Sequence, residues 1–131
     1  IDWSRGYNRV YIGIRKSSLT SIEFLKKLSA HAAMFKRTMI PKGVKGYVLI
    51  ANNDYEVAYV NWESEKSHDD AYQTAGGISV AIDGTQILDN LLYQEAKPYI
   101  TNLRKNVIEG EAYSTLPASY PYVGNYDGDG H

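Results

Sequence analysis

The sequence predicts a single α+β domain in which the elements follow the order β-α-β-β-α-β and both helices lie on one face of the sheet. Two observations support this fold class. Residues 46–65 read as two strands rich in Val, Ile, Tyr and Leu, joined by a tight turn of Asn and Asp at residues 52–54. Residues 7–16 alternate in polarity as a half-buried strand does, and an amphipathic helix follows them.

The first strand has two distinct faces. One face holds Val10, Ile12 and Ile14, and the other holds Tyr11, Gly13 and Arg15. The helix that follows is predicted to begin at residue 21, because Thr20 and Glu23 have the spacing of a capping box. Its buried face is predicted from apolar residues that recur every three or four positions, namely Ile22, Leu25, Leu28, Ala32 and Phe35. Pro41 and Gly43 are expected to end the segment.

The second helix is predicted to begin near Glu65, with acidic residues in its first turns. The Gly76–Gly77 pair is expected to interrupt it. The helix then resumes over residues 78–92, with an apolar face of Ile87, Leu88, Leu91 and Leu92. The last strand is predicted at residues 99–107, directly after Pro98, which has no N–H to donate to a strand ladder.

Residues 109–131 differ in composition from the rest of the chain, because they are rich in Tyr, Pro and Gly. We predict a domain over residues 1–108 and a Tyr-rich C-terminal arm without regular structure over residues 109–131. The predicted sheet has apolar side chains on both faces, and two helices can cover only one. A homodimer in which two sheets pack face to face would cover the other.

Length and composition exclude several classes of protein. The chain has 131 residues, of which 44% are hydrophobic and 22% charged, as is typical of one globular domain. Fourteen basic and fifteen acidic residues nearly balance, so no charge pattern indicates nucleic acid. There is no cysteine, which excludes disulfides and thiolate zinc sites. No apolar run reaches the roughly 18 residues of a membrane span, and we expect a cytoplasmic protein.

Two short segments resemble motifs of a known family. Residues 41–47 have the sequence PKGVKGY, which looks like the family's turn from helix to strand. Residues 60–65 have the sequence VNWESE, which looks like its strand-ending step before the second helix. With the order of elements, the chain resembles the dimeric α+β-barrel superfamily over about residues 7–107, and within it the antibiotic-biosynthesis-monooxygenase-like domains. The resemblance implies a ferredoxin-like sandwich that dimerises into an α+β barrel.

Members of this superfamily share a fold and differ in chemistry. They include cofactor-independent oxygenases that turn phenols into quinones, haem-degrading oxygenases, polyketide cyclases and small-acid isomerases. The resemblance implies a small-molecule biosynthetic enzyme, first of all a cofactor-independent monooxygenase with an aromatic or polyketide-like substrate. The alternatives are a polyketide cyclase or other proton-transfer enzyme, and a non-catalytic module that binds aromatic ligands. Haem ligation is not expected, because residues 77–87 lack the histidine of the haem-degrading branch.

The candidate catalytic residues are His31, Asn61, Trp62 and Tyr72, placed between the sheet and the two helices. An imidazole and a phenol can move protons, an amide can hold an oxyanion, and an indole can stack against a ring. His31 could equally be a hydrogen-bonded helix residue, and Trp62 a hydrophobic plug under the second helix. Strand alternation sends Asn61 and Trp62 to opposite faces, so both can line one site only where the strand ends or bulges.

The candidate substrate-binding residues are Tyr11, Arg15, Asn52 and Tyr59. Tyr11 and Arg15 share a strand face and could bind a phenolate or carboxylate. Arg15 could equally form a salt bridge, and Asn52 could serve only the turn. No metal and no cofactor are expected, since the sequence lacks a phosphate-binding glycine loop and a zinc motif.

Overall fold

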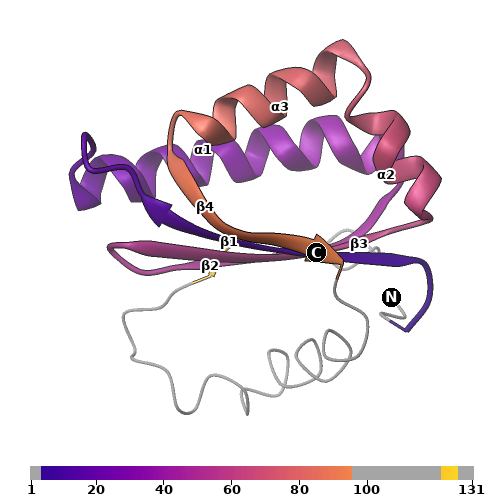
Figure 1. Ribbon diagram of the computed structural model, residues 1–131, viewed down its shortest axis with the longest axis horizontal. Helices are drawn as coiled ribbons and strands as arrows, with labels where there is room; N and C mark the ends of the chain where they lie inside the picture. The colour runs from indigo at the N-terminus through magenta and orange to yellow at the C-terminus, as the bar shows by residue number, and fades with distance from the viewer. Residues whose placement is uncertain (1–3, 96–121, 127–131) are drawn as a thin grey trace.

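An antiparallel sheet and a layer of helices make up the part of the chain that the computed structural model describes, residues 4–95 and 122–126. The strands are β1 (Tyr7–Arg15), β2 (Val44–Ala51), β3 (Tyr55–Trp62), β4 (Leu88–Glu95) and β5 (Tyr122–Tyr126), in the spatial order β4-β1-β3-β2-β5. The helices of the described residues all lie on one side of the sheet (Figure 1). The predicted α+β fold class is confirmed.

Alternation along the strands gives the sheet two apolar faces. Tyr7 pairs with Trp62 and Tyr11 with Ala58, and these residues face the helices. Val48 pairs with Tyr59 on the opposite face. The predicted hairpin is confirmed, because β2 and β3 pair in register on either side of the turn at residues 52–54. Both faces contain buried side chains, but homodimerisation through the second face stays a prediction.

Helix α1 (Ser21–Met39) has the predicted start, with a complete capping box between Thr20 and Glu23. Its buried residues are Phe24, Leu28, Ala32, Phe35 and Met39. Ile22 was expected on that face but is 69% exposed, because the buried stripe runs through Phe24 instead. The short 3-10 helix η1 (Ile40–Lys42) ends the segment at Gly43.

The second helical region consists of two helices, α2 (Glu65–Ala71) and α3 (Ala75–Thr85). The break lies at residues 72–74, not at the Gly76–Gly77 pair as predicted. Thr74 is the reason, because its side chain accepts a hydrogen bond from the Gly77 N–H at 3.0 Å and caps a new helix. The two glycines therefore lie in the first turn of α3. No helix within the described residues is long and apolar enough to cross a membrane.

The prediction that the helix extends to residue 92 is wrong. Helix α3 ends at Thr85, and Leu88–Glu95 form strand β4, which pairs with β1. A short leucine-rich run fits a helix or a buried strand equally well, and pairing with the open edge of β1 decides for the strand. Leu88 lies directly over Gly13 of β1, where a Cβ would be 2.9 Å from its side chain. The strand predicted at residues 99–107 lies outside the described residues.

The C-terminal arm contains one regular element. Residues Tyr122–Tyr126 form β5, which pairs with β2 at the edge of the sheet. The expectation of no regular structure in residues 109–131 is therefore wrong for these five residues. Most of the predicted arm lies outside the described residues, and the division at residue 108 stays a prediction.

We expect Gly77→Ala to lower the free energy of unfolding by about 3 kcal/mol, because helix α3 begins too close to the end of α2 for a side chain. A Cβ at Gly77 would lie 1.9 Å from the backbone oxygen of Ala71. A Cβ at Gly76 would lie 3.1 Å from the methyl group of Thr38, a side-chain atom that can shift by a few tenths of an ångström. Gly76→Ala is therefore the control, expected within about 1 kcal/mol of wild type because alanine favours the helix. Urea denaturation measures both, and equal stabilities would contradict the expectation.

Candidate active site

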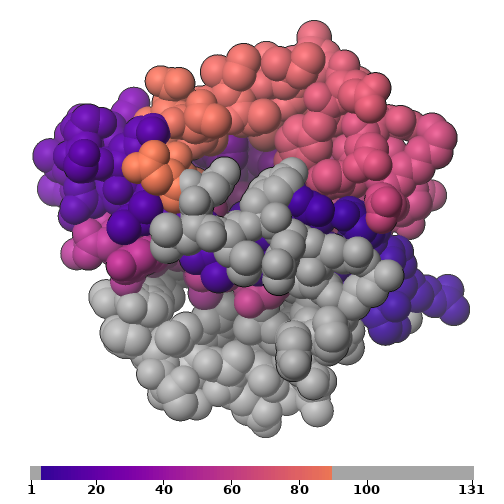
Figure 2. All heavy atoms as spheres, viewed as in Figure 1, coloured from indigo at the N-terminus to yellow at the C-terminus, as the bar shows by residue number. Residues whose placement is uncertain are grey.

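A cavity of about 410 Å³ lies between the sheet and the helices. This volume is within the usual range of small-molecule sites, about 300–1,000 Å³. In the space-filling view the surface is hollowed beneath α3 (Figure 2). Most of the lining is apolar or aromatic and includes Tyr11, Phe35, Tyr47, Leu49, Val60 and Tyr72. The cavity thus suits a flat, largely apolar ligand.

His31 lines the cavity from α1 and is held by an acidic side chain from α3. Its Nδ1 lies 2.7 Å from Oδ2 of Asp83. An ionised Asp83 accepts a hydrogen bond from Nδ1–H, which leaves Nε2 as the nitrogen that can take a proton. Gly84 lies against the same ring, since a Cβ there would be 3.5 Å from Cε1 of His31. The pair therefore has the arrangement of a positioned general base.

Glu56 is a buried carboxyl group on the sheet side of the cavity. It lies on β3 with Ala58, Val60 and Trp62, at the alternate positions that face the helices, and only 5% of its surface is exposed. Its Oε2 has no hydrogen-bond partner among the described residues. Burial raises the pKa of Glu56 to about 8. The side chain is therefore mostly neutral at pH 7 and can donate a hydrogen bond.

Three tyrosines share the cavity lining with this carboxyl, namely Tyr11, Tyr47 and Tyr72. Burial raises the pKa of Tyr47 well above its usual value, and the nearby Glu56 and Tyr72 add to the increase. Tyr47 therefore stays protonated at all physiological pH values. Its ring packs against Phe35, with the centroids 4.6 Å apart, and the two rings form part of the cavity wall.

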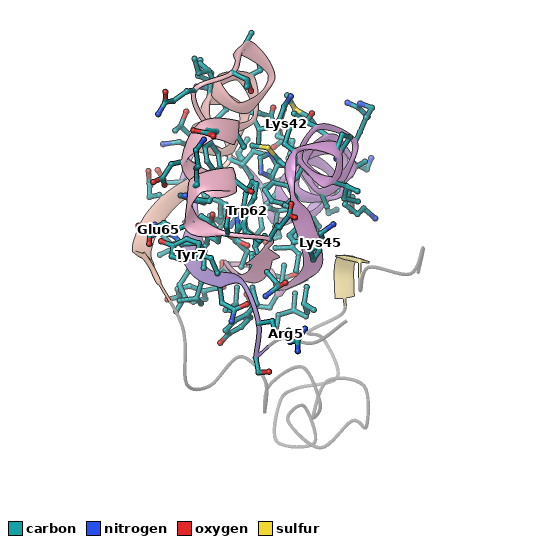
Figure 3. All side chains as sticks on the ribbon, turned by 90° about the vertical axis from the view of Figure 1, so that its right-hand side faces the viewer. Arg5, Tyr7, Lys42, Lys45, Trp62 and Glu65 are labelled. Carbon is teal, nitrogen blue, oxygen red and sulfur yellow. The ribbon has the colours of Figure 1, made fainter. Side chains whose placement is uncertain are left out.

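Three of the residues predicted for the site line the cavity: His31, Tyr72 and Tyr11. They come from α1, from the end of α2 and from β1, three elements that are distant in sequence. Trp62 lies next to them but not on the cavity surface. It is fully buried between the sheet and the helices (Figure 3), and its ring centroid is 6.0 Å from that of Tyr72. In this position the indole packs against the ring of Tyr72, which itself lines the cavity.

Asn61 lies on the other face of the sheet, as strict alternation requires. Its Nδ2 donates hydrogen bonds to the backbone oxygen of Arg5 at 2.8 Å and to Oδ1 of Asn8 at 2.7 Å. Arg5 lies on the side of the sheet away from the helices (Figure 3). Tyr59 shares this face, where it pairs with Val10 and Val48. These two predicted residues are therefore separated from the cavity by the sheet.

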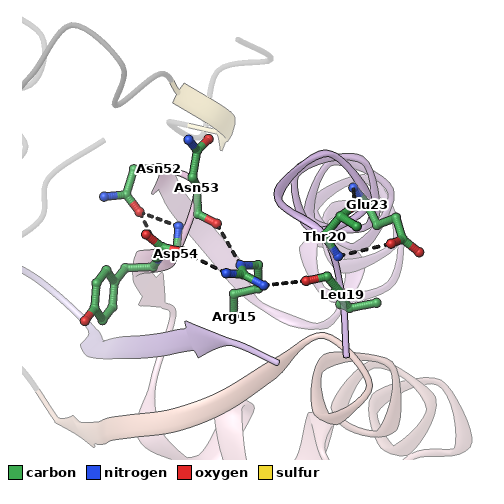
Figure 4. Close-up of polar contacts among 8 residues, drawn as sticks. Arg15, Leu19, Thr20, Glu23, Asn52, Asn53 and Asp54 are labelled. Atoms are coloured by element: carbon green, nitrogen blue, oxygen red, sulfur yellow. Dashed lines mark hydrogen bonds and ion pairs between the residues drawn. The ribbon is translucent and has the colours of Figure 1, made fainter. Parts of the chain in front are cut away.

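Asn52 belongs to the hairpin turn, and Arg15, at the end of β1, contacts it (Figure 4). Arg15 donates to the backbone oxygens of Asn53 and Leu19 and forms a 3.0 Å salt bridge with Asp54. The side-chain oxygen of Asn52 accepts hydrogen bonds from the backbone N–H groups of residues 54 and 55. Both side chains thus hold the turn, and neither lines the cavity.

Two acidic residues of the cavity region were not among the predicted site residues. Glu56 could have been found from the sequence. It is the one charged residue on the strand face that otherwise holds Ala58, Val60 and Trp62. Asp83 carries no such signal, because its partner His31 is 52 positions away in sequence. Within the described part of the chain, no cluster of three or more His, Cys, Asp or Glu side chains could hold a metal ion.

Comparison with known proteins gives a match among solved structures. No family model matches the chain, and no curated protein does. Among solved structures, the chain is similar to a mutant of SnoaB, a cofactor-independent oxygenase from Streptomyces nogalater. The sequences are 16% identical, the match covers 70% of this chain and 92% of SnoaB, and the TM-score is 0.50. The match confirms the ferredoxin-like α+β fold. Closer membership in the antibiotic-biosynthesis-monooxygenase-like family stays a prediction.

Proposed function

We propose that the protein is a small-molecule biosynthetic enzyme, a cofactor-independent monooxygenase that binds an aromatic or polyketide-like substrate in the cavity. The observation that supports this most is the His31–Asp83 pair on the wall of an aromatic-lined cavity. The fold shared with SnoaB, a cofactor-independent oxygenase, adds support.

The chemistry that the cavity could perform begins with a proton transfer. Nε2 of His31 takes a proton from an acidic C–H group of the substrate, and the carboxylate of Asp83 stabilises the imidazolium that forms. The resulting carbanion is conjugated with the aromatic rings, and it donates electrons to dioxygen to form a C–O bond. Loss of the second hydrogen from that carbon breaks the O–O bond. One oxygen atom then remains as a ketone and the other leaves as water, so a reduced aromatic ring becomes a quinone.

A proton-transfer enzyme is the second candidate, and one observation favours it. His31 and Glu56 lie on the helical and sheet sides of the same cavity, and each can give or take a proton. Such a pair can catalyse an isomerisation or an aldol-type ring closure without dioxygen. A module that only binds an aromatic ligand is the remaining alternative.

The test is oxygen consumption by the purified protein with dithranol, a reduced polyphenol, after treatment with a chelator and without added flavin. We expect dioxygen uptake well above the rate of spontaneous oxidation in buffer, with the corresponding quinone as product. Turnover that persists at the same rate without dioxygen would indicate the proton-transfer enzyme. Binding without turnover under both conditions would indicate the binding module.

A further inference from the structure

Glu56 is the one acidic side chain among the described residues that line the cavity, and none of them is Lys or Arg. The lining therefore offers a ligand carboxylate no permanent cation, and the imidazole of His31, which also lines it, is already paired with Asp83. Oε2 of Glu56 is buried and has no partner among the described residues. A buried polar group without a partner is unfavourable, and such groups in native proteins call for an explanation. A ligand in the cavity would supply the missing partner.

The surroundings indicate the kind of partner. Burial raises the pKa of Glu56 to about 8, so at neutral pH the group offers an O–H donor. The titratable groups that share the cavity with it are His31 from α1, Tyr11 from β1, Tyr47 from β2 and Tyr72 after α2. An apolar lining without a second carboxylate disfavours a cationic ligand, because desolvation of an ammonium group would be poorly compensated. A neutral oxygen that accepts a hydrogen bond suits the site better.

We propose that Glu56 donates a hydrogen bond to a carbonyl oxygen of the substrate and so selects ligands that present one. This inference deepens the proposed function and rests on it. Glu56 comes from the sheet and His31 from the helices, so a ring held between the layers can meet both groups. When His31 removes a proton from a carbon conjugated with the carbonyl, negative charge collects on the carbonyl oxygen. A neutral carboxyl group placed there stabilises that enolate.

The test is binding of three probes that share one bicyclic skeleton, measured by calorimetry under nitrogen. The probes are α-tetralone, which has a carbonyl group, tetralin, which has none, and the amine of tetralin, which is cationic. At about pH 6 we expect the wild type to bind the ketone roughly tenfold more tightly than the hydrocarbon, as one hydrogen bond allows. Equal affinity for ketone and hydrocarbon, tightest binding of the amine, or no binding of any probe would overturn the inference.

Two variants sharpen the result. Glu56→Gln keeps a donor of the same size, and we expect it to retain the preference for the ketone within about threefold. Glu56→Met removes the donor, and we expect the preference to disappear while tetralin binds as before. At about pH 10 the wild type should lose the preference because Glu56 is ionised, whereas Glu56→Gln should keep it. A preference that survives in Glu56→Met would overturn the inference.

The binding test is independent of the oxygenase assay. If the ketone preference is absent but dithranol is oxidised, the role of Glu56 is wrong and the proposed function stands. If the preference is present but no dioxygen is consumed, Glu56 recognises a carbonyl group in an enzyme or module of another kind.

Discussion

Glu56→Gln is expected to be more stable than the wild type in alkaline solution and about equal to it near pH 5. The folded protein raises the pKa of this carboxyl from 4.5 to about 8 through burial. Between these values the folded state binds a proton that the unfolded state has lost, so the wild type loses stability as the pH rises. Glutamine does not titrate and avoids that loss. Since one pKa unit corresponds to about 1.4 kcal/mol, we expect a difference on the order of 4 kcal/mol above pH 8.

Urea denaturation at a series of pH values measures the difference between the two proteins. Glu63→Gln is the matched control, because it makes the same chemical change at an exposed position close by in sequence. We expect the control to follow the wild type across the whole range. If the stability of Glu56→Gln parallels that of the wild type from pH 5 to pH 9, burial in the folded state does not raise the pKa of this carboxyl.

Local patterns were sufficient to predict most of the fold. The capping box at Thr20 and the turn at residues 52–54 are short-range signals, and each gave the boundary of its element closely. The leucine-rich run from residue 87 was assigned to a helix because periodicity cannot separate a short buried strand from a helix. β1 pairs with β3 along one edge, and its other edge is left for Leu88–Glu95 to pair with. This pairing joins residues far apart in sequence, so it cannot be read from a local pattern.

The candidate site was predictable only in part, because it depends on which face of each element is turned inward. Alternation in β3 turns Glu56 and Trp62 toward the helices and Asn61 away from them. Amide chemistry had suggested Asn61 for the site, but its side chain instead holds the segment before β1. His31 was proposed from its chemistry alone, whereas its partner Asp83 becomes visible only once α3 lies beside α1.

His31→Ala is expected to lower the turnover number of the oxygenase reaction by about 10²–10⁴-fold, the usual contribution of a positioned general base. Asp83→Asn should give a smaller loss, because the imidazole remains but the carboxylate no longer stabilises its protonated form. KM for dithranol should change little in Asp83→Asn, since Asp83 does not line the cavity.

The matched control is Lys27→Ala, an exposed position one turn earlier on α1, which should keep wild-type turnover. Exogenous imidazole should partly restore the rate of His31→Ala, because the lost side chain leaves room for it in the cavity wall. Rescue separates a missing base from a damaged fold, which imidazole could not repair. Wild-type turnover in His31→Ala would remove His31 from the mechanism.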